Sequence, residues 1–441
     1  MRIISRVSVA DEARYQVYNK IAVKILPLLL VSYMLAVLDR VNVSFAQLEM
    51  GPALGLTAAM YGFGAGIFYL SYCACEIPSN YIMHRIGARI WLARIMVVWG
   101  LLSAATSLIQ TPTQFYSMRF ILGIAEAGFY PGALLYISYW FPAQLRSQAT
   151  AFMLIATSLA SVIGGPVSSG IMHYMDGIAG MAGWQWVFVV EGIPASLLGI
   201  VVYVVLRNGP NDVPWLSAEE KAIVQEDLAA ERAQQSEAGA HHKFADAFRN
   251  PNVWCIVVAN FCNLSTLYGI QFWMPTIIRG VSGASVLATG FISASLSILP
   301  IFALIYVAKS SDRKRERRWH ATIGYATAVC GLLLAGSFPQ STAAALIGMT
   351  LALCGQQVVS VMLFSLPAAF LMGAAAAAGF AIITTVGNLA GYSMPFLFGV
   401  LKGATGGFSA GFFVMATLAT IGAMMIQVTP ALRKGGIGTG A

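Results

Sequence analysis

Charged residues are scarce in this sequence of 441 residues. Asp, Glu, Lys and Arg make up only 10% of the chain, hydrophobic residues make up 58%, and the mean hydropathy is +0.73. A soluble globule of this size needs far more polar residues to cover its surface. The composition therefore excludes a single soluble domain and predicts an all-α polytopic membrane protein.

Histidine and cysteine are also few, with five and six residues. The cysteines fall in apolar stretches without a paired Cys or His spacing that would suit zinc, so we expect small core residues and no metal site. The histidines lie at loops or span ends, and no apolar span carries a Ser/His/Asp or Cys/His set. We therefore expect neither a cofactor nor an enzyme. The net charge of +8 does not indicate nucleic acid, because the basic residues separate apolar spans instead of clustering on a soluble face.

Twelve apolar stretches are long enough to cross a membrane, which takes a helix of about 20 residues. They are residues 21 to 46, 58 to 82, 91 to 110, 114 to 140, 150 to 175, 184 to 206, 251 to 278, 286 to 308, 320 to 338, 343 to 365, 375 to 401 and 408 to 428. The first 20 residues lack the short apolar core of a cleavable signal peptide, so we expect the first span to remain in the protein.

A polar segment at residues 207 to 250 divides the twelve spans into two groups of six. Within it, Ser217 and Glu220 have the spacing of a capping box, which predicts a short soluble helix. Two basic loops, beginning at His84 and Asp312, resemble each other at an offset of 228 residues, which favours repeated halves. The predicted domains are an N-terminal tail (1 to 20), a six-helix bundle (21 to 206), the linker (207 to 250), a second six-helix bundle (251 to 428) and a C-terminal tail (429 to 441).

The basic residues are distributed unevenly between the two sides of the predicted membrane. The side with both termini and the linker carries 21 of the 26 Lys and Arg, whereas the opposite side carries only Arg279 and Lys402. Lys and Arg retained in the cytoplasm set the orientation of membrane proteins. We therefore predict that both termini and the linker are cytoplasmic.

Two charged residues, Arg119 and Glu126, lie inside the fourth apolar stretch. Together with Gly123 and Tyr130 they recur every three or four residues and so share one face of a continuous helix. A charged residue at mid-membrane costs about 2.5 to 3.5 kcal/mol on insertion scales, so such residues face a protein interior or a water-filled cavity. We expect this face to point into the bundle.

Polar residues differ in kind between the two halves. The N-terminal half carries charged residues within its spans: Asp39, Arg40, Glu76, Arg119, Glu126 and Glu191. The second half offers amides, hydroxyls and phenol rings instead: Asn260, Asn263, Tyr268, Gln271, Gln356, Gln357, Thr384, Asn388 and Tyr392. This division predicts that one half handles charge and the other forms neutral hydrogen bonds.

Adjacent charges occur at Asp39 and Arg40 in the first span. Neighbouring residues diverge by about 100° around a helix, so these two must have different partners. Arg40 and Arg119 lie at similar depths, and two guanidinium groups in one layer suit carboxylate or phosphate recognition. The alternative is a closed network in which the four charges, Glu126 included, pair with one another and only hold helices together.

Several motifs together resemble one known family. They are LDRVNVSFA, YLSYCACEIPSN, ARIWLARI, RFILGIAEAGFYPG, SYWFP, GGPVSSG, GWQWVFVVEGIP, WLSAEEK and GNLAGYSMPFLFG. This ordered set, spread over residues 20 to 430, resembles the anion:cation symporter family of the major facilitator superfamily, in its bacterial branch of tartrate, phthalate and sugar-acid permeases. One departure is SNYIMHRIGAR, which stands where the superfamily's loop signature usually has an initial Gly and an Asp.

The resemblance implies a twelve-helix fold and proton-coupled uptake of organic anions across a bacterial cytoplasmic membrane. In that family the position matching Arg40 holds the substrate carboxylate, those matching Asp39 and Glu126 carry protons, and that of Arg119 modulates them. Three further positions resemble substrate contacts: Tyr72, Gln271 and Asn388. The expected partners are a small organic anion, protons and the lipid bilayer, with no obligate protein partner. An uncoupled facilitator or anion antiporter would use the same arginines without titrating carboxyls.

Overall fold

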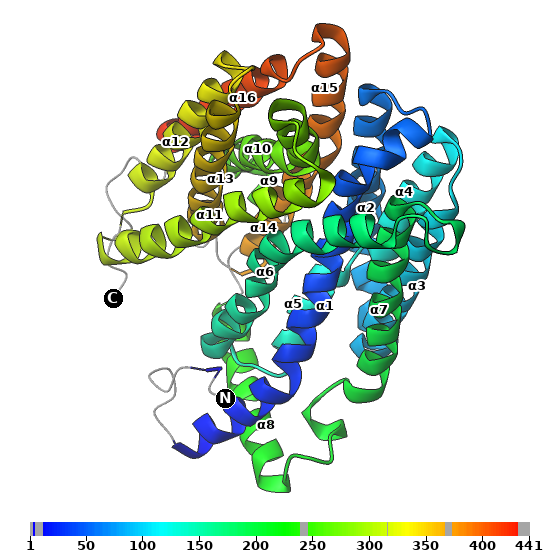
Figure 1. Ribbon diagram of the computed structural model, residues 1–441. Helices are drawn as coiled ribbons and strands as arrows, with labels where there is room; N and C mark the ends of the chain where they lie inside the picture. The colour runs from blue at the N-terminus through cyan, green and yellow to red at the C-terminus, as the bar shows by residue number, and fades with distance from the viewer. Residues whose placement is uncertain (1–2, 5–11, 239–245, 315, 367–372, 431–441) are drawn as a thin grey trace.

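The computed structural model describes residues 3–4, 12–238, 246–314, 316–366 and 373–430. Within this part of the chain the secondary structure is helical, and twelve helical segments are long and apolar enough to cross a membrane. The predicted all-α fold with twelve membrane-spanning helices is confirmed. Figure 1 shows the helices of the N-terminal half on one side of the molecule and those of the C-terminal half on the other.

The helices follow the predicted spans closely. Those of the first half are α1 (Glu12–Ala53), α2 (Ala58–Ile86), α3 (Ala88–Ala105), α4 (Pro112–Glu126), α5 (Phe129–Ser138), α6 (Ala143–Met175) and α7 (Gly183–Val205). The linker contains α8 (Ala218–Ala238) and α9 (Asp246–Arg249). Those of the second half are α10 (Pro251–Ser282), α11 (Val286–Lys314), α12 (Arg318–Ser337), α13 (Thr342–Ser365), α14 (Gly373–Asn388), α15 (Ala390–Thr405) and α16 (Ser409–Val428).

Two details of the sequence interpretation differ from the structure. Helix α1 begins at Glu12, so the expected boundary between a polar tail and the first span lies inside this helix. All six cysteines are free, as expected, but only Cys73, Cys262 and Cys354 are buried, and Cys330 is exposed. A membrane protein can expose an apolar side chain to lipid, so burial does not follow from an apolar sequence context.

Side-chain caps define where several helices begin. The hydroxyl of Thr57 accepts from the N–H of Met60 at the start of α2, and Thr111 does the same for Gln114 at the start of α4. These contacts satisfy backbone N–H groups that a helix leaves without intrahelical partners. Pro112 follows Thr111 as the first residue of α4, where its missing N–H costs no hydrogen bond.

Helix α8 packs on the N-terminal half. Its start is the predicted capping box: the N–H of Ser217 donates to Glu220 Oε2 (2.8 Å), and the N–H of Glu220 donates to Ser217 Oγ (3.1 Å). Glu220 also pairs with Lys20 of α1 at 2.8 Å, and Glu231 pairs with Arg146 of α6 at 3.2 Å. Figure 1 shows α8 beside the first turns of α1. The linker helix is therefore attached to the first half by charge pairs.

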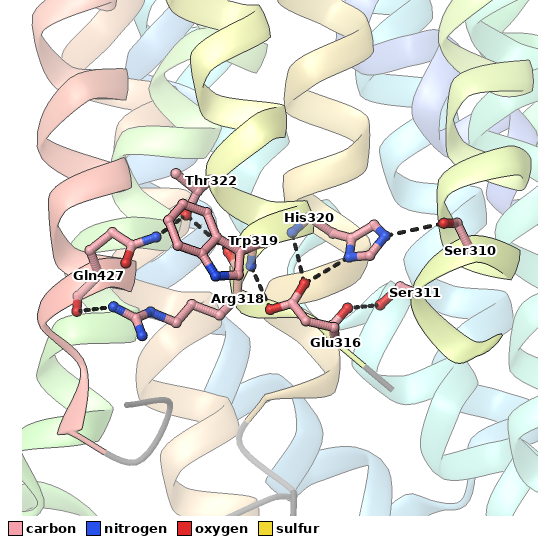
Figure 2. A network of polar contacts seen from close by, with 8 residues as sticks. All are labelled: Ser310, Ser311, Glu316, Arg318, Trp319, His320, Thr322 and Gln427. Carbon is pink, nitrogen blue, oxygen red and sulfur yellow. Dashed lines mark hydrogen bonds and ion pairs between the residues drawn. The ribbon is translucent and has the colours of Figure 1, made fainter. Parts of the chain in front are cut away.

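The loop between α11 and α12 is organised by Glu316 (Figure 2). Its carboxylate accepts from the N–H of Trp319 (2.7 Å) and contacts His320 Nδ1 (2.9 Å), and His320 Nε2 contacts Ser310 Oγ at 3.2 Å. Partial burial raises the pKa of Glu316, but hydrogen bonds from Trp319 and His320 outweigh this effect. The pKa of Glu316 therefore lies below its ordinary value. This carboxylate therefore caps the start of α12 and fixes the basic loop to α11.

The two halves meet through close contacts between helix backbones. A Cβ added at Gly62 of α2 would lie 2.3 Å from Pro395 O of α15, and one added at Gly165 of α6 would lie 2.6 Å from Gly290 O of α11. Gly399 of α15 approaches the first turn of α2 in the same way. These contacts lie toward the end of the bundle where α1 and α15 stop and α2 and α16 begin, here called the distal end. The absence of side chains is what permits this closure.

Candidate functional site

A break in the fourth span positions Glu126. The predicted continuous helix is wrong: α4 stops at Glu126 and α5 starts at Phe129, because Gly128 adopts a left-handed conformation with φ +88°. The hydroxyl of Ser79 on α2 donates to the carbonyl of Ala127 at 2.6 Å and so satisfies a backbone group at the break. Glu126 therefore stands at a helix end, and Tyr130 belongs to the next helix.

Arg40 and Glu126 form an ion pair across α1 and α4. Arg40 Nε lies 2.6 Å from Glu126 Oε1, and the Glu126 side chain is completely buried. The Arg40 guanidinium lies over the ring of Tyr72, 4.8 Å from its centroid. Arg40 Nη2 and Glu126 Oε2 are both buried without a hydrogen-bond partner among the described residues. The Arg40–Glu126 pair thus makes only one of the hydrogen bonds open to it. Arg40 Nη2 remains available as a donor, and Glu126 Oε2 remains available as an acceptor.

Arg119 is buried and forms no ion pair with any of the described residues. Its side chain is 1% exposed, its Nη2 donates to the carbonyl of Ala65 at 3.4 Å, and its guanidinium lies 4.8 Å from the centroid of the Phe68 ring. Its Nε and Nη1 have no partner in the described chain. The expectation that Arg119 and Glu126 face the interior is confirmed. Phe68 also lies 5.9 Å from the Arg40 guanidinium, so both arginines contact one ring.

Asp39 points away from Arg40. One of its carboxylate oxygens accepts from the hydroxyl of Ser103 on α3 and from Asn42 Nδ2, the latter at 3.3 Å. The prediction that the adjacent charges have different partners is confirmed. Among the four charges, the described contacts include one ion pair, between Arg40 and Glu126, and none for Arg119 or Asp39. Of the closed network of four paired charges, the described residues therefore form only the Arg40–Glu126 part.

Neutral residues of the second half approach the cluster from α10 and α14. The hydroxyl of Tyr268 donates to Asn388 Oδ1 at 3.2 Å, and the Tyr268 ring lies 4.6 Å from that of Tyr69 on α2. Asn388 ends α14, where a break at Leu389 separates it from α15. Gln271 lies one turn after Tyr268 on α10, half-buried and without a hydrogen bond from its amide within the described residues.

The structure thus brings the predicted residues together in two groups. Asp39, Arg40, Tyr72, Arg119 and Glu126 form the charged group, and Asn388 with Tyr268 forms the neutral one, joined through Tyr69. Sequence reasoning missed the ring of Phe68 and the hydroxyl of Ser103. Neither has a signal of its own, because an apolar ring and a serine inside an apolar span are most often packing residues.

Comparison with known proteins gives the family. Residues 29–395 match the model of the Major Facilitator Superfamily. A putative tartrate transporter of Agrobacterium vitis is 39% identical over 420 residues, covering 95% of this chain and 92% of that protein. The putative metabolite transport protein NicT of Pseudomonas putida is 39% identical over 421 residues, 96% of both chains.

Solved structures agree on the fold. A D-xylose-proton symporter superimposes with a TM-score of 0.71 at 17% identity, covering 92% of this chain and 97% of that one. A bacterial homologue of the human lysosomal transporter Spinster gives a TM-score of 0.76 at 16% identity, covering 98% and 100%. With twelve spans, this fold and these relatives, the chain belongs to the Major Facilitator Superfamily and is a multi-pass secondary transporter, not an enzyme.

Proposed function

We propose that this protein imports a small organic anion together with protons by alternating access. The observation that carries the proposal is the pair of arginines: three of their guanidinium nitrogens, on Arg40 and Arg119, are buried in the bundle interior without a hydrogen-bond partner among the described residues. Such nitrogens are donors matched to the planar oxygens of a carboxylate. A buried cation without an anion is costly, so a carboxylate between the two arginines would be strongly favoured.

The ion pair between Arg40 and Glu126 supplies a coupling mechanism. A substrate carboxylate that binds Arg40 competes with Glu126 for the same guanidinium, and a proton on Glu126 removes that competition. Substrate and proton therefore each favour the binding of the other, as linkage requires. Asp39 would carry a further proton beside the arginine layer. Proton release on the other side would restore the ion pair and expel the anion.

The substrate class follows from the neutral group and from the relatives. Tyr268, Asn388 and Gln271 offer hydroxyl and amide groups that suit the hydroxyls or second carboxylate of a small acid. The relatives named tartrate transporters support tartrate, or a related hydroxy acid, sugar acid or dicarboxylate. Tyr72 would pack its ring against the substrate or against the Arg40 guanidinium that holds it.

Transport in proteoliposomes tests the coupling. Wild-type protein should accumulate labelled tartrate when the outside is more acidic. Glu126→Gln mimics the protonated form and cannot release a proton, so it should lose accumulation but keep exchange of labelled for unlabelled substrate. Glu49→Gln, on α1 outside the cluster, should accumulate as the wild type does. Gradient-driven accumulation by Glu126→Gln with unchanged pH dependence would contradict the proton role of Glu126.

The second candidate function is uncoupled or exchange transport of the same anions. It is favoured by Arg119, which forms no ion pair within the described residues and could bind a carboxylate without displacing Glu126 from Arg40. A protonophore separates the two functions: it should abolish accumulation by the wild type if transport is proton-coupled. Accumulation that persists with the protonophore, and depends on a counter-anion inside the vesicles, would favour an antiporter.

We also propose that the protein lies in a bacterial inner membrane with both termini and the linker in the cytoplasm, and that it functions without an obligate protein partner. The charge distribution supports this orientation. A reporter enzyme that is active only outside the cytoplasm should be silent when fused after Lys434. The same reporter fused between Ala53 and Ala58, where α1 and α2 are joined, should be active. The opposite pattern would reverse the orientation.

A further inference from the structure

A groove lies between α3 and α7 on the outer side of the first half. The two helices pack closely, since a Cβ added at Gly199 would lie 2.9 Å from the backbone nitrogen of Val97. Figure 1 shows both helices at the edge of the first half that faces away from the second half. The groove has a volume of about 310 Å³. Most of its lining side chains are apolar, namely Ile90, Ala93, Val97, Val98 and Ile200.

The groove opens on a face that lipid should cover. Ile90 is 46% exposed and Ile200 is 54% exposed, and Leu197 and Val204 beside them on α7 are exposed as well. Apolar side chains this exposed on the spans of a membrane protein contact the hydrocarbon of the bilayer. An acyl chain is therefore the neighbour that this face meets first.

Arg94 places a positive charge in the same groove. It lies six residues after the first residue of α3, about 9 Å along the helix axis. Its side chain is half-buried, and it forms neither an ion pair nor a hydrogen bond with any described residue. A cation beside hydrocarbon is costly unless it reaches water or an anion. Because the arginine side chain is long, its guanidinium can reach the level of the lipid headgroups.

The surroundings hold this guanidinium in place. It lies 3.9 Å from the centroid of the Trp91 ring. Trp91 Nε1 donates to Ser79 Oγ on α2 at 3.0 Å, and Ser79 Oγ donates to the carbonyl of Ala127 at 2.6 Å. At the end of α7, Arg89 Nε donates to the carbonyl of Tyr203 at 2.6 Å. The cation and the ring beneath it are thus positioned before any ligand binds, which reduces the entropic cost of binding.

We propose that this groove binds one anionic phospholipid, with its phosphate on Arg94 and part of an acyl chain along the apolar wall. The phosphate oxygens match the paired N–H groups of a guanidinium. A free phosphate would satisfy Arg94 but would leave the apolar wall uncovered. Under the proposed orientation the site lies in the cytoplasmic leaflet, where basic residues attract anionic lipids. Such binding is independent of the transported anion and of proton coupling.

Native mass spectrometry of the purified full-length protein tests the site. It compares binding of the first phosphatidylglycerol with that of the first phosphatidylcholine, both with the same acyl chains. The wild type should bind phosphatidylglycerol about five-fold more tightly, the effect of one basic residue near an anionic lipid. Arg94→Gln should abolish this preference. Arg85→Gln, which changes an exposed arginine at the same end of the bundle, should keep it.

A second variant tests the apolar wall. Val97→Phe keeps every charge but fills the groove, so it should weaken the first binding of both lipids, and it serves if Arg94→Gln does not fold. Equal affinities of the wild type for the two lipids, or a preference unchanged in Arg94→Gln, would mean ordinary lipid solvation and would overturn the proposal. Binding of both lipids by Val97→Phe as tight as in the wild type would also overturn it.

Thermal unfolding in detergent separates a lipid from a free anion. Phosphatidylglycerol should raise the thermal midpoint of the wild type more than that of Arg94→Gln, because a ligand stabilises the state that binds it. Inorganic phosphate should affect both proteins equally. Stabilisation by inorganic phosphate that is lost in Arg94→Gln would make a free anion the ligand instead of a lipid.

Discussion

The two halves of the bundle have similar architecture and different chemistry. In the first half, Asp39, Arg119 and Glu126 are buried, and Arg40, with a side chain 15% exposed, lies in the same cluster. In the second half, the residues that approach this cluster are neutral, with Tyr268 donating to Asn388. Buried charges bind other charges strongly and respond to protons, whereas neutral donors respond to shape and hydrogen-bonding pattern. Under the proposed function, the first half would determine affinity and coupling and the second would select among substrates.

The largest effect should come from removing a buried charge of the first half. Arg119→Met keeps the length of the side chain but removes its guanidinium. We expect substrate binding to weaken by about 3 to 5 kcal/mol, the typical result of removing one partner of a buried charge pair, which is at least about 100-fold in Kd. Titration calorimetry with tartrate measures it, and Arg85→Met in the last turn of α2 is the control. Binding as tight as that of the wild type would remove Arg119 from the site.

A smaller effect should follow from keeping the charge of Arg40 and changing its shape. Arg40→Lys retains a cation for Glu126 but cannot present two parallel N–H groups. We expect substrate affinity to fall by about 1.5 to 3 kcal/mol, the range for hydrogen bonds to charged groups. The control is Arg146→Lys, which holds the linker instead. Wild-type affinity in Arg40→Lys, with normal expression, would make Arg40 a structural partner of Glu126.

Changes in the neutral half should alter selectivity instead of coupling. Asn388→Ala and Tyr268→Phe each remove one neutral hydrogen-bonding group. We expect each to change the ratio of affinities for hydroxylated and unhydroxylated acids by about 0.5 to 1.5 kcal/mol. The pH dependence of uptake should stay that of the wild type. Competition assays with a panel of organic acids measure the ratio. A shifted pH profile without altered selectivity would break the division of labour between the halves.

The smallest effect concerns the linker. Hydrogen bonds from Lys20 and from the Ser217 N–H lower the pKa of Glu220 in the folded protein. A carboxyl whose folded pKa is lowered stabilises the fold above its unfolded pKa, and this contribution is lost as pH falls through the folded value. Because the pair is partly exposed, we expect roughly 0.2 to 1 kcal/mol. The thermal midpoint of Glu220→Gln should therefore lie slightly below that of the wild type at pH 7 and converge with it at acidic pH, below the lowered pKa of Glu220. Equal midpoints at both pH values would mean that this pair does not hold α8.

Hydropathy was sufficient for the fold because lipid requires long apolar helices wherever the chain crosses the membrane. The ends of those helices were less accessible. Helix α1 continues to Glu12 through polar residues because α8 packs against them, and a contact between distant segments leaves no local signal. The break after Glu126 did have one, since Gly128 and Pro131 follow in sequence, but the apolar context concealed it.

The charged residues of the candidate site could be predicted from the sequence, but their contacts could not. Charged residues inside apolar spans named Arg40, Arg119 and Glu126 without any structure. Their pairing was not predictable, because whether Glu126 contacts Arg40 or Arg119 depends on how α1 packs against α4. The neutral contacts were even harder to predict from the sequence. Asn388 is one of several amides in the second half, and only the fold brings it to Tyr268.

The glycines at the distal end also give control over the balance between conformations. A methyl group at Gly62 or Gly165 would collide with backbone of the opposite half, which cannot move aside as a side chain can. Only the arrangement in which these helices touch would be penalised, and any arrangement in which they separate would not. A ligand or mutation that acts on one of two states shifts their populations by its full free-energy difference. Substituting Gly62 or Gly165 by alanine should therefore favour conformations that are open at the distal end, which would help in determining their structures.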